Sequence, residues 1–157
     1  MPENESGAEK GSILVIDDDP LLRRTLQKVL EREGYFVDVA HDGHEGVRKA
    51  RSGFFHLVIC DIKMPGLDGL MTVERIKKIQ AKTGEGYSGC LMITAYDTPE
   101  TTQKAVRLGV TGFMRKPFDL DRILAEVNHQ VDTLKPAKNS LAGIKQLNER
   151  LKMLINA

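Results

Sequence analysis

The chain has 157 residues, a length that suits one domain with some chain left over at its ends. Its apolar content of 41%, with five Phe, three Tyr and no Trp, is typical of an aliphatic α/β core. A formal net charge of +1 at pH 7 gives no indication of binding to nucleic acid, and no apolar run is long enough for a transmembrane helix.

The N-terminal segment and the cysteines indicate the cellular compartment. Residues 1–11 are polar and contain no apolar stretch, so we expect a disordered leader and no signal peptide. Cys60 and Cys90 lie in apolar, strand-like runs, and their spacing does not suggest a disulfide framework. Because buried free thiols fit a reducing compartment, we expect a soluble cytoplasmic protein without a membrane partner.

Five short apolar runs predict strands, and a helical pattern follows each of them. Leu57–Cys60 is apolar at every position, which is typical of a strand buried on both faces of a parallel sheet. Another run contains Asp38, as expected near a sheet edge. The five predicted strands are Ile13–Ile16, Phe36–Ala40, Leu57–Cys60, Leu91–Ile93 and Val110–Met114.

Capping residues and glycines mark the helices between these strands. A short polar residue before a proline or an apolar stripe predicts a helix start, and a glycine after the stripe predicts its end. Strict alternation of strand and helix favours an α/β fold, a doubly wound five-stranded parallel sheet with helices on both faces. The predicted helix starts are Asp19, Asp42, Asp68, Thr98 and Asp119.

The last part of the chain predicts one extra helix. Lys135-Pro136 is expected to end the fifth helix. Beyond it, residues 135–157 carry an apolar stripe at three- and four-residue spacing, typical of an amphipathic helix. This helix either folds back on its own domain, pairs with a second copy of the chain, or begins a linker to an output module. The stripe consists of Leu141, Ile144, Leu147, Leu151 and Leu154.

Polar side chains follow four of the five predicted strands: Asp17 and Asp18, Asp61, Thr94 and Lys116. Because the carboxyl ends of parallel strands share one edge of a sheet, we expect these groups to converge. Carboxylates held so close repel one another, and a hard divalent cation, Mg²⁺ or Mn²⁺, would relieve the repulsion. Asp61 could then attack a phosphoryl group, with Lys116 and Thr94 facing the phosphate oxygens.

Four sequence motifs surround these strand ends: Ile13-Leu14-Val15-Ile16-Asp17-Asp18-Asp19, Cys60-Asp61-Ile62-Lys63-Met64-Pro65-Gly66-Leu67-Asp68-Gly69, Ile93-Thr94-Ala95-Tyr96 and Gly112-Phe113-Met114-Arg115-Lys116-Pro117-Phe118. As an ordered set, these motifs resemble the response-regulator receiver domain of bacterial two-component signalling, a family that includes the chemotaxis response regulator. The resemblance covers residues 12–134 and implies a flavodoxin-like strand order of 2-1-3-4-5.

The resemblance also implies a metal site and an acceptor. Asp61 would accept a phosphoryl group from a histidine kinase or a phosphotransfer protein. Asp18, Asp61 and the backbone carbonyl of Lys63 would bind Mg²⁺ directly, while Asp17 would act mostly through water. Thr94 and Phe113 would form a switch pair.

In the same family, the lysine corresponding to Lys116 pairs with the phosphate, and the peptide bond that follows it is cis. The resemblance implies a signalling switch that is not an enzyme beyond its own phosphorylation and dephosphorylation. Its partners would be the kinase and either a downstream effector protein or an output domain outside this chain. A second copy of the chain, forming a homodimer, is a further candidate partner.

One alternative belongs to a different functional class. Asp17-x-Asp19 superficially fits the first motif of a Mg²⁺-dependent phosphatase of the haloacid dehalogenase type, in which Asp17 would be the nucleophile. Pro20-Leu21 does not continue that motif, and no second acidic pair follows Lys116. The receiver interpretation is therefore the preferred one.

Overall fold

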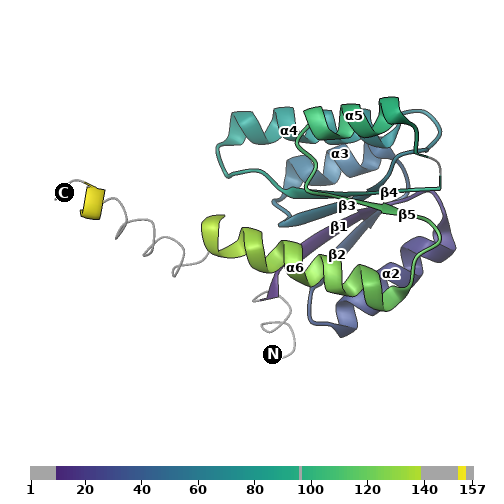
Figure 1. Ribbon diagram of the computed structural model, residues 1–157, viewed down its shortest axis with the longest axis horizontal. Helices are drawn as coiled ribbons and strands as arrows, with labels where there is room; N and C mark the ends of the chain where they lie inside the picture. The colour runs from purple at the N-terminus through teal and green to yellow at the C-terminus, as the bar shows by residue number, and fades with distance from the viewer. Residues whose placement is uncertain (1–9, 96, 139–151, 155–157) are drawn as a thin grey trace.

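The structure is a computed structural model that describes residues 10–95, 97–138 and 152–154 (Figure 1). Strands and helices alternate along the chain, which confirms the predicted pattern. The strands are β1 (Ser12–Ile16), β2 (Phe36–Ala40), β3 (Leu57–Asp61), β4 (Gly89–Thr94) and β5 (Gly112–Arg115). The helices are α2 (Pro20–Arg32), α3 (Gly43–Ser52), α4 (Gly69–Thr83), α5 (Pro99–Arg107) and α6 (Leu120–Lys138).

In the described part of the chain the five strands form one parallel sheet in the order β2-β1-β3-β4-β5. This confirms the order 2-1-3-4-5. All residues of β3 are buried, as the apolar run Leu57–Cys60 predicts for a central strand. β2, which carries Asp38, lies at an edge. Because every strand runs in the same direction, the residues that follow β1, β3, β4 and β5 lie at one edge of the sheet.

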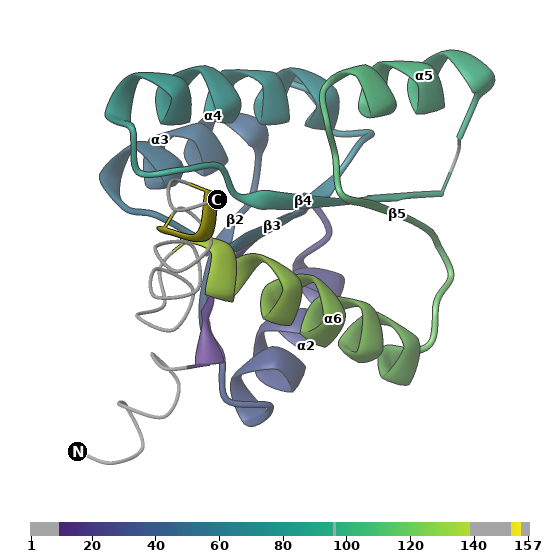
Figure 2. The same cartoon turned by 60° about the vertical axis from the view of Figure 1, so that its left-hand side comes forward.

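Helices cover both faces of the sheet. Figures 1 and 2 show α2 and α6 on one face and α3, α4 and α5 on the other. Successive side chains of a strand point to opposite faces, so Ile59 packs with the α2 and α6 layer while Val58 and Cys60 pack with the opposite layer. Cys60 and Cys90 are buried free thiols, as predicted. Each fully buried aliphatic side chain contributes roughly 2 kcal/mol.

Side-chain caps determine where the helices begin. Asp19, Asp42, Asp68 and Thr98 each accept a hydrogen bond from a backbone N–H in the first turn of the helix that follows. Such a cap stabilises a helix by about 1 kcal/mol. Asp119 directly precedes α6, and its backbone carbonyl accepts hydrogen bonds from the first turn. These positions agree with the predicted helix starts.

Several strand bounds differ from the prediction by one or two residues, and the last helix ends later than predicted. β5 begins at Gly112 and not at Val110, because the Val110 N–H is bonded to the carbonyl of Ala105 at the end of α5. The predicted end of the last helix at Lys135-Pro136 is wrong, since α6 continues to Lys138. Proline removes one N–H from the helix ladder and crowds the carbonyl four residues earlier, but its φ is itself helical, so its effect can be a kink and need not be a stop.

The predicted leader and tail helix lie mostly outside the described residues. Residues 1–9 and 139–151 are not among them, so the leader and most of the apolar stripe between Leu141 and Leu154 stay predictions. Among the helices that the structure describes, none combines the length and the apolar character that a membrane span needs.

Candidate functional site

Three charged side chains meet at the carboxyl edge of the sheet. Asp17 follows β1 and is fully buried, Asp61 ends β3 with 5% of its surface exposed, and Lys116 follows β5. The Lys116 ammonium nitrogen lies 3.2 Å from Asp17 Oδ2 and 3.1 Å from Asp61 Oδ2. One cation therefore bridges two carboxylates that come from neighbouring strands.

Asp18 completes a group of three carboxylates. One oxygen from each of Asp17, Asp18 and Asp61 lies within 4.8 Å of the others, and Asp18 is exposed to solvent while the other two are buried. Hard oxygen donors with one side open to water fit Mg²⁺, which keeps several water ligands, and they also suit Mn²⁺. Zinc sites in proteins are built mainly from cysteine and histidine, so this set of donors fits the predicted metal better.

Burial and charge determine the protonation of this cluster. Burial raises the pKa of the Asp17 carboxyl above its ordinary value, and the backbone N–H of Asp19 opposes the rise only in part. Burial lowers the pKa of the Lys116 ammonium, but the charges of Asp17 and Asp61 outweigh it and leave that pKa above its ordinary value. Lys116 is therefore protonated at neutral pH, and its charge allows two buried carboxylates to lie side by side.

The loop between β3 and α4 orients the Asp61 side chain. The Lys63 N–H donates to Asp61 Oδ1 at 3.3 Å, and the Gly69 N–H donates to the carbonyl of Ile62 at 2.7 Å. A Cβ at position 69 would stand 2.2 Å from the carbonyl oxygen of Asp61. Because glycine has no Cβ, α4 can begin directly against the end of the strand that carries Asp61.

Thr94 and Phe113 lie on the two strands next to this cluster. Thr94 ends β4 and is fully buried, and its carbonyl accepts a hydrogen bond from the Lys116 N–H at 2.8 Å. Phe113 lies on β5, is half-buried and packs against the core beneath α3, α4 and α5. The peptide bond between Lys116 and Pro117 is cis, as the family resemblance implies.

Two contacts near the cluster were not predicted. The Arg23 guanidinium, from α2, donates to the carbonyl of Asp17 at 2.8 Å. Arg115 donates to Asp97 Oδ2 through Nε at 3.0 Å and Nη2 at 2.7 Å, which links β5 to the loop before α5. Arginine and aspartate are ordinary surface residues, so no sequence signal marks these pairs before the strands are placed next to one another.

Comparison with known proteins gives the family. Residues 13–128 match the response regulator receiver domain. The uncharacterized transcriptional regulatory protein YkoG of Bacillus subtilis is 34% identical over 119 residues, covering 76% of this chain and 50% of the relative. Transcriptional regulatory protein ZraR of Salmonella typhimurium is 35% identical over 114 residues, covering 73% of this chain and 25% of the relative. The chain thus spans half or less of these two proteins.

A third relative and two solved structures agree with this family. FixJ of Bradyrhizobium diazoefficiens, a transcriptional regulatory protein, is 30% identical over 145 residues, covering 92% of this chain and 68% of the relative. A CheY-like receiver domain protein from Methanospirillum hungatei has a TM-score of 0.73 at 27% identity, covering 79% of this chain and 95% of its own. Chemotaxis protein CheY4 of Vibrio cholerae has a TM-score of 0.68 at 29% identity, covering 75% and 96%. The sequence match and the strand order of the sheet together show that the chain belongs to the response regulator receiver domain family.

Proposed function

We propose that this chain is a phosphorylation switch that receives a phosphoryl group on Asp61 from a phosphohistidine of a kinase or phosphotransfer protein. The observation that supports this most directly is the arrangement around Lys116. Its ammonium lies within hydrogen-bonding distance of Asp61 and Asp17, and Asp18 lies beside them on the solvent side. Such a cluster can neutralise the negative charge that a phosphoryl group brings to a carboxylate.

In the proposed transfer, an Asp61 carboxylate oxygen attacks phosphorus, the phosphorus–nitrogen bond breaks, and its electron pair stays on the imidazole. The product is an aspartyl phosphate. The carboxylates of Asp17, Asp18 and Asp61, with the backbone carbonyl of Lys63, would hold Mg²⁺, whose charge offsets that of the phosphoryl oxygens. Lys116 keeps its proton and pairs with one of those oxygens.

We further propose that the switch works through Thr94 and Phe113. The Thr94 hydroxyl would move toward the phosphoryl oxygens, and the Phe113 ring would turn into the space that is left. Thr94 is fully buried, whereas Phe113 is only half-buried. The Phe113 ring could therefore leave a partly solvent-exposed position when it turns inward. Beyond its own phosphorylation and dephosphorylation, the chain would catalyse no reaction.

The proposed partners are a histidine kinase or phosphotransfer protein, acting before this chain, and an effector, acting after it. The relatives named above are transcriptional regulatory proteins, and this chain spans only part of YkoG and ZraR. The output would therefore come from a further domain or from a separate protein, and a second copy of the chain is another possible partner. We expect the switch to work in the cytoplasm.

The test is the intact mass of the protein after incubation with acetyl phosphate and Mg²⁺. We expect one phosphoryl adduct on the wild type and none on Asp61→Asn or in the presence of EDTA. Asp38→Asn is the matched control, because Asp38 is a carboxylate on the edge strand that pairs with Lys49, and this variant should be phosphorylated like the wild type.

The same experiment distinguishes a receiver, with its acceptor at Asp61, from the phosphatase alternative, with its nucleophile at Asp17. A nucleophilic Asp17 would leave the adduct intact in Asp61→Asn and abolish it in Asp17→Asn, and reduction of the acyl phosphate followed by peptide mapping would locate it. In the structure Asp17 is fully buried, with Oδ1 bonded to the Asp19 N–H at 2.9 Å and Oδ2 to Lys116. An adduct on Asp17 would overturn the proposed function.

A further inference from the structure

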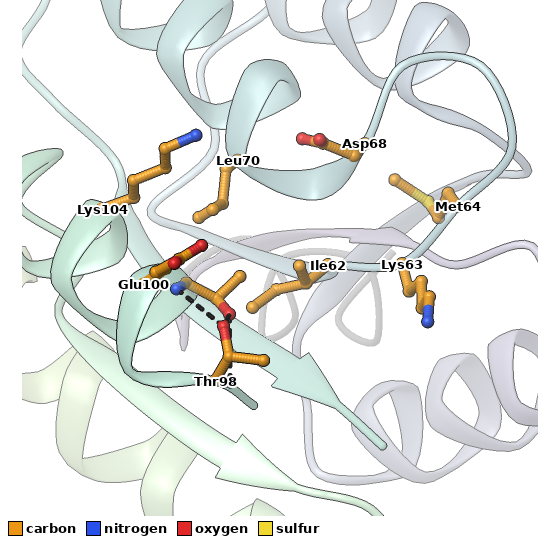
Figure 3. A pocket seen from close by; sticks show the side chains of 9 residues that line it. Ile62, Lys63, Met64, Asp68, Leu70, Thr98, Glu100 and Lys104 are labelled. Atoms are coloured by element: carbon orange, nitrogen blue, oxygen red, sulfur yellow. Dashed lines mark hydrogen bonds between the residues drawn. The ribbon is translucent and has the colours of Figure 1, made fainter. Parts of the chain in front are cut away.

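A groove runs between α4 and α5, on the face of the sheet that also carries α3. It consists of three cavities of about 310, 360 and 380 Å³ that share lining residues. The first two share Leu70 and Lys104, and the last two share Glu74 and Leu108. Figure 3 shows the first cavity, where Leu70 at the start of α4 and Lys104 on α5 lie near each other. We call this continuous hollow the α4–α5 groove.

The groove exists because α5 is only lightly anchored. Ala105 is the one residue of α5 that is fully buried, whereas α4 buries six residues along its length. Leu108, just after α5, is half-buried at the floor of the groove, and Met71 on α4 stays 46% exposed at its side. Apolar surface therefore lies open between the two helices without a side chain of the described residues to fill it.

The rims of the groove carry five cations and three carboxylates, and the first cavity contributes Lys63 and Glu100 to this count. Lys77, Lys78, Lys104 and Arg107 line the second and third cavities, against the carboxylates of Asp68 and Glu74. The Asp68 carboxylate is already engaged, since it accepts the Met71 N–H as the cap of α4. Among the described residues no carboxylate lies within 4.0 Å of the charged groups of Lys78, Lys104 or Arg107. These cations can accordingly pair with a ligand without breaking an existing ion pair.

We propose that the α4–α5 groove binds an acidic amphipathic segment of a partner protein. Apolar side chains of that segment would cover Leu70, Met71 and Leu108, and its carboxylates would pair with Lys104 and Arg107. An amphipathic helix in a groove between two helices is a common mode of peptide recognition, and complementary charge at the rim gives specificity. A nucleic acid would satisfy the cations but would leave the apolar floor without matching side chains. The proposal does not depend on phosphorylation of Asp61.

The experiment uses the full chain without a phosphodonor and two fluorescein-labelled synthetic peptides. One is an amphipathic helix of leucine and glutamate, and the other has lysine in place of every glutamate. We expect fluorescence anisotropy to show binding of the glutamate peptide alone, weakened by added salt. The double variant Lys104→Glu/Arg107→Glu should bind it at least about tenfold more weakly. Amide chemical shifts of the wild type should change in α4 and α5.

The matched control is Arg24→Glu/Lys28→Glu, which makes the same charge change on exposed positions of α2, in the opposite helix layer. It should bind the glutamate peptide like the wild type. Circular dichroism checks that each variant is folded. If Lys104→Glu/Arg107→Glu unfolds, the neutral variant Lys104→Gln/Arg107→Gln takes its place. No binding of the glutamate peptide, equal loss in both double variants, or equal binding of the lysine peptide would overturn the proposal. So would a single-stranded oligonucleotide that competes for the groove.

Discussion

At the scale of single residues, one ammonium group controls the electrostatics of the site. Lys116→Met would leave Asp17 and Asp61 buried without their common cation, and we expect a loss of roughly 3 kcal/mol in the free energy of unfolding at pH 7. The pKa of Asp17 is already raised by burial, so the folded state favours the protonated acid. The penalty is absent below the ordinary carboxyl pKa and grows as pH rises through the raised one. Urea unfolding should therefore show a smaller loss at pH 4.5 than at pH 7.

Lys49→Met is the matched control for this prediction. Lys49 pairs with Asp38 at 2.8 Å, but at the sheet edge, where Asp38 is partly exposed and water screens the charges. We expect its loss to be about 1 kcal/mol or less and nearly equal at the two pH values. A Lys116→Met loss that does not change with pH, or that only matches the Lys49→Met loss, would contradict the interpretation of the cluster.

At the scale of elements, the contact between α4 and the end of β3 requires a glycine. In Gly69→Ala the new methyl group would stand 2.2 Å from the carbonyl oxygen of Asp61, so strand and helix must move apart. We expect a loss of about 2 kcal/mol in the free energy of unfolding. Phosphorylation by acetyl phosphate should also be slower, because the shift moves the Asp61 backbone.

Gly53→Ala is the comparison for this second prediction. Position 53 has an extended backbone with φ of −166°, and a Cβ there would meet no heavy atom within 4 Å. We expect a change of about 0.5 kcal/mol or less and an unchanged phosphorylation rate. Thermal or urea unfolding of both variants gives the comparison, and similar losses in the two would show that close packing at position 69 is not the cause.

At the scale of the whole molecule, binding of a metal ion at the acidic cluster would couple to the stability of the fold. A ligand that binds only the folded state stabilises it by an amount that grows with its concentration, about 1.4 kcal/mol at ten times the dissociation constant. We expect Mg²⁺ to raise the midpoint of thermal unfolding, measured by calorimetry. Asp18→Asn should abolish this shift because Asp18 is one of the three clustered carboxylates, whereas Asp38→Asn should keep it. An equal shift in Asp18→Asn would place the metal elsewhere.

Much of the fold follows from local sequence. Leu57–Cys60 is apolar at every position and becomes the fully buried centre of the sheet, and Asp68 caps the next helix as predicted. The strand-end groups Asp61 and Lys116 could be expected to meet because parallel strands share a carboxyl edge. The strand order came from the family resemblance, since apolar periodicity alone does not specify which strands are neighbours.

The sequence by itself determined the elements, their caps and the polar residues at the strand ends, because these depend on side chains close together in the chain. Only the tertiary structure decided that Lys116 bridges two carboxylates 99 and 55 residues away, and that Arg115 pairs with Asp97. It also decided that α5 buries only Ala105 and leaves an open groove beside α4. Distances between segments and spaces between helices are set by how whole elements pack, and local patterns do not encode that packing.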